Sequence, residues 1–138
     1  MSNSSGIHLP KREKDNIVRV GIVGAAGYTG GELIRLLIHH PVAQVVFAHS
    51  ESNAGNLVAD VHEGLIGDTS LRFTSEMLLD KIDVLFLCFG HGKSREYLDT
   101  HDIPCHVKII DLAQDFRIKD NSHDFIYGLP EAYREEIR

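Results

Sequence analysis

Three regularly spaced glycines form the most suggestive chemical motif of the sequence. Gly24, Gly27 and Gly30 lie in the stretch GAAGYTG, which separates a β-branched run from a helical pattern. Glycines at such a turn let the backbone come close to phosphate oxygens, and the helix that follows offers free N–H groups and a partial positive charge. The spacing is G-x-x-G-x-x-G rather than the standard G-x-G-x-x-G. We expect the pyrophosphate of a dinucleotide to bind here, against Gly24, Ala25, Gly27, Tyr28, Thr29 and Gly30.

Two other enzyme classes use a glycine-rich loop, and the sequence argues against both. Short-chain dehydrogenases and related epimerases need a Tyr-x-x-x-Lys pair, but none of the four tyrosines has a lysine at that spacing. A P-loop is suggested by Gly92-Lys93-Ser94, yet the first glycine of that motif would fall at Leu87. A leucine does not readily form the phosphate-wrapping turn, so a nucleotide triphosphatase is disfavoured. A βα turn that binds nothing is the remaining alternative.

The polar segment 49–56 follows a predicted strand, at the place where the adenosine ribose of a dinucleotide is held. Glu51 favours NAD, because an acidic side chain there accepts hydrogen bonds from a free ribose hydroxyl. Ser50, Ser52 and Asn53 could instead hydrogen-bond the 2′-phosphate of NADP. The segment by itself leaves both cofactors open, with an ordinary exposed loop as the third alternative.

Further polar residues follow two other predicted strands, at the edge where open α/β sheets bind ligands. His91 and Gly92 lie in the stretch FGHG, and we expect them near the nicotinamide side of the cofactor. We interpret His91 as a loop-positioning or cofactor-contacting residue rather than an acid–base catalyst. Arg117 could hold a phosphate or carboxylate of the substrate by a bidentate contact. Pairing of Arg117 with Asp115 or another nearby acid is an equal alternative.

The cysteines and histidines show no catalytic or metal-binding pattern. Cys88 falls inside an apolar run, where a cysteine is usually a small core residue, and Cys105 follows Pro104 in a predicted loop. The histidines have none of the familiar metal-ligand spacings, so we expect no metal site and interpret them as surface or packing residues. Two thiols make no disulfide framework, which favours a reducing, cytoplasmic setting.

Alternating strand and helix patterns must position these side chains. Apolar, β-branched runs predict strands at 17–23, 45–49, 82–89 and 107–112, with minor strands at 71–74 and 124–127. Helical patterns lie at 31–40, 76–81 and 93–101, and a charged helix begins near 131. The segment 50–67 is predicted to be a functional loop with a short helix. This alternation predicts an α/β fold of the Rossmann type, with a doubly wound, mostly parallel sheet.

Composition limits the function classes. The 138 residues suit one globular domain, with 43% hydrophobic and 25% charged residues. A net charge of −6 disfavours nucleic acid and anionic membranes as partners, and no apolar run approaches the roughly 18 residues of a membrane span. We expect a flexible leader at 1–16 and a NAD(P)-binding domain at 17–138. The charged final segment has no helix stop signal, which suggests a piece of a longer protein.

Together these segments resemble the N-acetyl-gamma-glutamyl-phosphate reductase family. The matching stretches are GAAGYTGGELIRLL at 24–37, SNAGN and VHEGL within 52–65, DVLFLCFGHG at 83–92, KIIDLAQDFR at 108–117 and YGLPE at 127–131. They follow the family's order over residues 17–138, and they correspond to the N-terminal part of the family's length. The combination of motifs carries the resemblance, since no single one is specific.

The resemblance implies the cofactor domain of a two-domain oxidoreductase of arginine biosynthesis. The family reduces N-acetyl-gamma-glutamyl phosphate to N-acetylglutamate semialdehyde with NADPH; a cysteine thiolate displaces phosphate, and hydride transfer to the thioester releases the aldehyde. The family's cysteine and histidine catalysts lie beyond the equivalent of residue 138. The resemblance therefore gives this chain no catalytic residue, and we expect it to be inactive alone. It also implies a small-molecule acyl-phosphate substrate, oriented by Arg117, and a full-length cytoplasmic homo-oligomer.

Some positions depart from the family pattern. Gly90 stands where proline is common, Ala113 stands where serine is common, and neither Glu51 nor Asn56 is basic. Hydrogen bonds from the hydroxyl-rich loop to a charged phosphate contribute about 1.5–3 kcal/mol each, whereas repulsion by an outward-facing Glu51 costs about 1 kcal/mol in bulk solvent. We therefore expect NADP, with NAD as the alternative. A non-catalytic NAD(P)-binding sensor or regulatory module is the alternative function.

Overall fold

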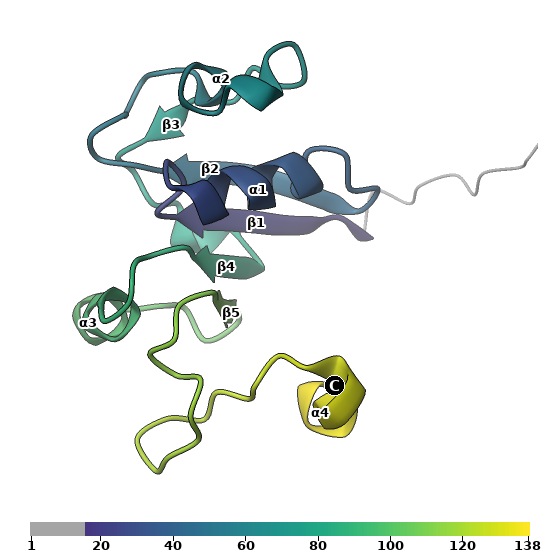
Figure 1. The fold of residues 1–138 in the computed structure, drawn as a ribbon, viewed down its shortest axis with the longest axis vertical. Coiled ribbons are helices and arrows are strands. Elements are labelled where there is room, and N and C mark those ends of the chain that lie inside the picture. The colour runs from purple at the N-terminus through teal and green to yellow at the C-terminus, as the bar shows by residue number, and fades with distance from the viewer. Residues whose placement is uncertain (1–15) are drawn as a thin grey trace, which may run out of the picture.

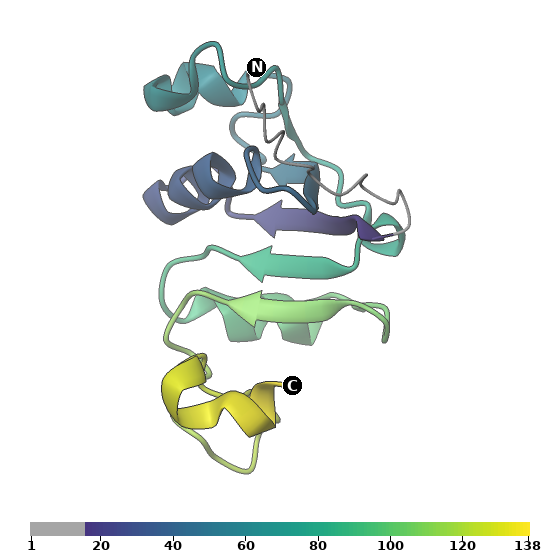
Figure 2. The same cartoon turned by 90° about the vertical axis from the view of Figure 1, so that its right-hand side faces the viewer.

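The computed structural model describes residues 16–138, so all but the last residue of the predicted leader lies outside the described part of the chain (Figure 1). Five strands form one sheet in the order β3-β2-β1-β4-β5, and every neighbouring pair is parallel. Figure 2 shows the arrowheads of β1, β4 and β5 at the same edge of the sheet. The strands are β1 (Val18–Val23), β2 (Ala43–His49), β3 (Phe73–Thr74), β4 (Val84–Leu87) and β5 (Lys108–Asp111).

Helices connect these parallel neighbours. Helix α1 (Tyr28–Leu37) leads from β1 to β2 and crosses in front of both strands in Figure 1. Helix α3 (Lys93–Thr100) leads from β4 to β5. The shorter elements are α2 (Val58–Val61), the 3-10 turns η2 (Glu63–Leu65) and η3 (Leu79–Lys81), and the C-terminal α4 (Pro130–Ile137). The predicted Rossmann-type α/β fold is confirmed.

Side chains that alternate along the strands fill two hydrophobic clusters. Val20 and Ile22 of β1 belong to the cluster that contains Ile34 of α1. Val23 of the same strand belongs to the cluster that contains Tyr97 of α3. Successive strand residues face opposite sides of a sheet, so the continuous apolar runs of the sequence reflect burial on both faces.

Several boundaries differ from the sequence predictions. Helix α1 begins at Tyr28 rather than at residue 31, because the glycine loop turns directly into the helix. The predicted helix at 76–81 is reduced to the 3-10 turn η3. The predicted strand at 124–127 is wrong, since no strand forms there. The N–H of Phe125 donates instead to Nδ1 of His123, at 3.1 Å, and is withdrawn from any strand pairing.

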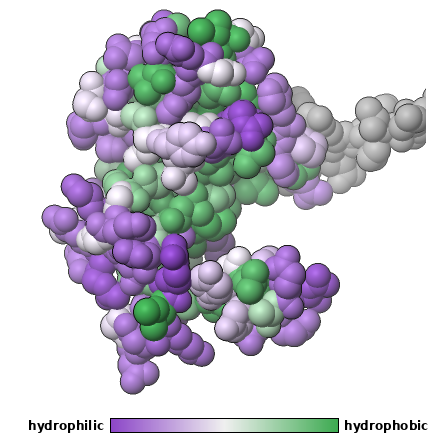
Figure 3. All heavy atoms as spheres, in the orientation of Figure 1, coloured by the Kyte–Doolittle hydropathy of each residue, from purple (hydrophilic) through white to green (hydrophobic). Residues whose placement is uncertain are grey.

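The edge strand β5 leaves apolar side chains at the surface. Ile110 of β5 and Leu112, directly after the strand, are each 42% exposed. Figure 3 shows apolar surface in the middle of this face, over the region of β4 and β5 in Figure 1. In the described part of the chain, no helix is both long enough and apolar enough to cross a membrane.

An ion pair ties the starts of β1 and β4 together at the opposite edge of the sheet. Asp83 Oδ1 accepts from Arg19 NH2 at 2.8 Å, and its Oδ2 accepts from Arg19 Nε at 3.1 Å. Oδ2 also accepts from the backbone N–H of Arg19, at 2.8 Å. These hydrogen bonds from Arg19 lower the pKa of Asp83 from 3.8 to about 2. Bidentate pairs of this kind fix geometry as well as charge.

Replacing this carboxylate tests the pair. Because the pKa of Asp83 is lower in the folded chain, its contribution to stability is present above about pH 4 and is lost as the pH falls through about 2. Asp83→Asn should lower the melting temperature by roughly 2–5 °C at pH 7, and most of the difference from the parent should be lost at pH 2. Thermal unfolding followed by circular dichroism measures both. Glu32→Gln, which removes an exposed pair within α1, is the control and should change the melting temperature less. An equal effect of Asp83→Asn at pH 2 and pH 7 would contradict the assignment.

Candidate cofactor site

Each glycine of the motif has its own structural reason. Gly24 has a φ of +76°, and a Cβ there would lie 2.6 Å from the carbonyl oxygen of Cys88, so the loop turns tightly over the end of β4. A Cβ at Gly30 would lie 2.7 Å from the Cα of Ala25, so this glycine lets α1 pack on the loop. Gly27 has a φ of −75°, and the nearest atom to a Cβ there would be 3.6 Å away. Its backbone does not need glycine, and its missing side chain leaves open space where α1 begins.

Helix α1 begins at this open position without a side-chain cap and without an acidic residue in its first turn. Within residues 16–138, the backbone N–H groups of Ala26, Tyr28 and Thr29 have no hydrogen-bond acceptor. Tyr28 is 87% exposed. Unpaired N–H groups and the positive end of the helix dipole together attract anions. The loop therefore offers open space and backbone donors of the kind that can bind a phosphate group.

The loop 50–56 is held together by the amide of Asn53. Its Nδ2 donates to Ser50 Oγ at 3.3 Å and to Ser52 Oγ at 3.1 Å. The three residues predicted to bind the adenosine end thus lie together at the end of β2. Ser50 is buried, with 9% of its surface exposed, whereas Ser52 is exposed. A ligand approaching from solvent would meet Ser52 and Asn53 before Ser50.

The Glu51 side chain points into solvent. It is 77% exposed, and its Oε1 lies 3.5 Å from Nε2 of His49. This contact is not a hydrogen bond, because Nε2 is buried with no hydrogen-bond partner among the residues that the structure describes. Because this carboxylate is largely exposed to solvent, its repulsion of a nearby phosphate would be weak.

Arg72 brings to this loop a cation that the sequence analysis missed. Its NH1 donates to the carbonyl oxygen of Gly55 at 2.8 Å. The contact arises because the end of the loop runs antiparallel to the start of β3, with Leu57 bridged to Arg72. Sequence offered no signal for it, since the partners are 17 residues apart and no local pattern pairs them.

The second glycine-rich stretch, after β4, is organised differently. Gly90 and His91 are exposed, and Gly92 has a φ of +85° and stands as N-cap of α3. Asp115 Oδ1 accepts from the N–H of Gly92 at 2.6 Å, and Oδ2 accepts from the N–H of Arg95 at 3.1 Å. Partial burial opposes ionisation, but these backbone N–H groups lower the pKa of Asp115. A carboxylate of the chain thus occupies the N-terminus of α3, which argues further against a P-loop there.

Cys88 lies in the core beneath the glycine loop and is not a nucleophile. It is 9% exposed, and burial, assisted by the charge of Asp111, raises the pKa of its thiol to about 12. Asp111 in turn accepts from Ser94 Oγ at 2.6 Å. Cys105 is exposed and free. In the described residues, no group of three or more His, Cys, Asp or Glu side chains is placed to hold a metal ion.

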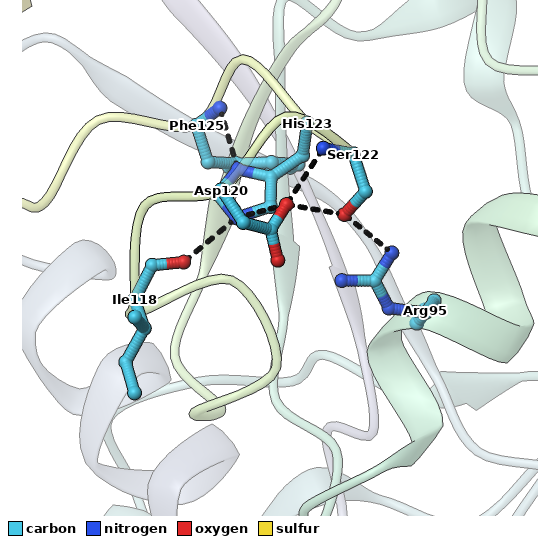
Figure 4. A network of polar contacts seen from close by, with 6 residues as sticks. All are labelled: Arg95, Ile118, Asp120, Ser122, His123 and Phe125. Atoms are coloured by element: carbon cyan, nitrogen blue, oxygen red, sulfur yellow. Dashed lines mark hydrogen bonds and ion pairs between the residues drawn. The ribbon is translucent and has the colours of Figure 1, made fainter.

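The loop after β5 is fixed by a compact network (Figure 4). Nδ1 of His123 accepts from Phe125, so the neutral ring donates from Nε2 to the carbonyl oxygen of Ile118 at 3.1 Å. Ser122 Oγ accepts from Arg95 NH1 at 3.2 Å and thereby ties the loop to α3. The loop is therefore ordered without forming a strand.

Arg117 is exposed on this loop and lines a cavity of about 620 Å³ that also touches α4. Lys119 and Tyr127 share the lining. In residues 16–138 Arg117 makes no ion pair, and Asp115 is engaged with α3 instead. The cavity follows β5 at one edge of the sheet, whereas the loop 50–56 follows β2 toward the other edge. The structure thus separates the predicted substrate residue from the predicted adenosine loop.

Comparisons with known proteins agree with this geometry. The family model "Semialdehyde dehydrogenase, NAD binding domain" matches residues 19–138. N-acetyl-gamma-glutamyl-phosphate reductase of Bacteroides thetaiotaomicron is 57% identical over 118 residues, which are 86% of this chain and 37% of that protein. The reductase of Phocaeicola vulgatus is 57% identical over 121 residues, which are 88% of this chain and 38% of that protein. The chain thus spans less than two fifths of the length of the curated relatives that it matches.

A solved structure shows the same fold. Aspartate semialdehyde dehydrogenase with NADP from Candida albicans superposes with a TM-score of 0.56 and 19% sequence identity, covering 73% of this chain and 31% of that chain. At this identity the likeness concerns the fold alone. The resemblance to the reductases that the sequence motifs suggested is confirmed by the curated relatives.

Gly27 offers a clean test of where a dinucleotide binds. Gly27→Val should leave the melting temperature nearly unchanged, because its φ suits any residue and the space around it is open. The new side chain should block the first turn of α1 and weaken NADPH binding at least 100-fold in a fluorescence titration. Gly30→Ala is the contrasting variant and should lower the melting temperature, since its Cβ would overlap the backbone of Ala25. Unchanged NADPH affinity in folded Gly27→Val would place the cofactor elsewhere.

Proposed function

The chain belongs to the semialdehyde dehydrogenase family through its NAD-binding domain, and from this premise we propose that it is the cofactor-binding part of an N-acetyl-gamma-glutamyl-phosphate reductase. The enzyme reduces N-acetyl-gamma-glutamyl phosphate to the semialdehyde in arginine biosynthesis. The relatives at 57% identity carry that name. The observation that supports this role most directly is the first turn of α1, which begins at the open Gly27 and whose N–H groups have no acceptor within residues 16–138.

NADP fits the residues at the adenosine end. The exposed hydroxyl of Ser52, held by the half-buried Asn53, offers a hydrogen-bond donor, and Arg72 adds the positive charge that a 2′-phosphate needs. Glu51 is directed into solvent and opposes this charge only weakly. When the cofactor is bound, its nicotinamide ring supplies the hydride. The residues named here would hold the adenosine end of the cofactor.

At the other end of the site, we assign roles by position along the sheet. His91 and Gly92 follow β4 and would lie beside the nicotinamide ribose; the N–H of Gly92 is already engaged by Asp115, so its contact would come from other backbone atoms. Arg117 would orient the charged groups of the substrate from its exposed position after β5. The thiol of Cys88 cannot capture the acyl group, because at neutral pH it is protonated and buried.

The remaining assignments follow from the same proposal. Residues 17–138 form the NAD(P)-binding domain, and a further part of the enzyme supplies the nucleophilic cysteine and its histidine partner. Both cysteines of the described chain are free thiols, which agrees with a reducing cytoplasmic setting. The complete enzyme would be a homo-oligomer with a small-molecule acyl-phosphate substrate.

Cofactor choice is tested by removing the Arg72 cation. Arg72→Gln should weaken NADPH binding about tenfold and leave NADH binding unchanged, because only NADPH carries a 2′-phosphate for the guanidinium to pair with. Isothermal calorimetry on both cofactors measures the two affinities. Arg134→Gln, on the distant helix α4, is the matched control and should change neither. Tighter binding of NADH than of NADPH by the parent chain would make the choice of NADP wrong.

The proposed activity is tested in a chimera. In the reductase of Bacteroides thetaiotaomicron, the segment that matches this chain is replaced by the corresponding residues of this chain. The two segments are 57% identical. The chimera should oxidise N-acetylglutamate semialdehyde in a phosphate-dependent reaction that reduces NADP, whereas the 138-residue chain alone should show no such activity. Gly27→Val in the chimera should abolish the reaction. A folded chimera that binds NADPH but has no activity would favour a non-catalytic binding module.

A further inference from the structure

His62 forms a contact that neither the proposed function nor the sequence analysis assigned to it. Its backbone is fixed between α2 and η2, where its N–H donates to the carbonyl oxygen of Val58 at 2.9 Å. Its side chain crosses to the glycine loop, and Nε2 lies 2.9 Å from the carbonyl oxygen of Ala25. A carbonyl only accepts, so Nε2 carries the proton and donates it. The interpretation of His62 as a surface or packing residue was therefore incomplete.

The imidazole ring of His62 packs against the backbone of α1 at Gly31, where any side chain would overlap it. A Cβ at Gly31 would lie 2.4 Å from Nδ1 and 2.6 Å from Cε1 of the imidazole. The edge of the ring also meets Phe73, with centroids 6.1 Å apart and planes at 62°. The fourth glycine of GAAGYTGG is thus explained by His62, which rests on the backbone of α1 at this position.

The carbonyl of Ala25, which accepts from His62, belongs to the same peptide unit as the N–H of Ala26. The peptide unit between Ala25 and Ala26 is planar and trans, so its C=O and its N–H point in opposite directions. With the oxygen of Ala25 bonded to His62, the N–H of Ala26 is directed away from His62. That N–H has no acceptor among residues 16–138. A rotation of this plane would withdraw the donor from the loop.

We propose that His62 is a positioning residue for the cofactor. Its imidazole, packed on Gly31, holds the Ala25 carbonyl so that the N–H groups of the glycine loop are set in advance for a pyrophosphate. Because His62 comes after the loop 50–56 and the short helix α2 that follows it, the same contact links the glycine loop to the chain segment that carries Ser52 and Asn53. This inference rests on the proposed dinucleotide site and adds a residue to it.

Two amide substitutions separate the hydrogen bond from the bulk of the ring. In His62→Gln the side-chain amide reaches the position of Nε2 and can donate to Ala25, whereas in His62→Asn it is one methylene shorter and cannot. His106→Asn is the matched control, because Nε2 of His106 also lies 3.2 Å from a backbone carbonyl, that of Ile82, before β4 and away from the glycine loop. The melting temperature and the NADPH and NADH affinities of each variant are measured on this chain, by thermal unfolding and calorimetry.

We expect His62→Asn to weaken the binding of both cofactors about tenfold, as the loss of one half-buried hydrogen bond predicts. The affinities of His62→Gln should remain within about threefold of those of the parent. His106→Asn should lower the melting temperature and leave both affinities unchanged. Parental affinity in His62→Asn would overturn the inference, as would an equal loss in His106→Asn, since affinity would then follow overall stability. If the parent chain itself binds neither cofactor, the proposed dinucleotide site is wrong, and so is the positioning role of His62.

Gly31→Ala tests the same contact independently, including in the case where His62→Asn fails to fold. The methyl group of the new alanine would displace the imidazole of His62, so Gly31→Ala alone should weaken NADPH binding about tenfold. Gly31→Ala combined with His62→Gln should recover part of this loss, because a flexible amide can pass the methyl group and still reach Ala25. An unchanged NADPH affinity in folded Gly31→Ala, or no recovery in the combined variant, would contradict the positioning role.

Discussion

The close approach of the loop after β1 to its neighbours is the constraint on which this site depends. Gly24 lies against the carbonyl of Cys88 at the end of β4, and the N–H of Ala25 donates to the carbonyl of His49 at the end of β2, at 3.1 Å. Because β1 lies between β2 and β4, the loop is anchored to both adjacent strands at once. A side chain at Gly24 would break this anchor and shift the start of α1.

Charge decides which of two helix N-termini can receive an anion. Both α1 and α3 begin just beyond the carboxyl edge of the parallel sheet, and both carry the positive end of a helix dipole. Asp115 fills the position at α3, while α1 has no cap and no acid in its first turn. In a chain with a net charge of −6, binding of a pyrophosphate therefore depends on one local arrangement of backbone donors rather than on overall attraction.

The segments that we propose to bind cofactor and substrate lie along one edge of the sheet in the order of its strands. The adenosine loop follows β2, the glycine loop follows β1, the FGHG stretch follows β4, and Arg117 follows β5. An extended dinucleotide can cross such an edge with its pyrophosphate in the middle. Arg72 reaches this edge only because the segment 50–57 folds back along β3. The proposed site therefore follows from the strand order together with the return of one loop.

The sequence by itself determined the class of fold and the place of the glycine loop. Continuous apolar runs such as 17–23 and 82–89 indicate strands buried on both faces, and GAAGYTG after the first run predicts a phosphate-binding turn. These are local signals, because period and turn chemistry depend on near neighbours. Only the tertiary structure decided that Gly27 is the open glycine, that Glu51 faces solvent, and that the strand predicted at 124–127 is a loop around His123. Arg72 and His62 likewise act on partners 17 and 37 residues away. Their roles arise from chain segments that meet in space, and no pattern of neighbouring residues encodes that meeting.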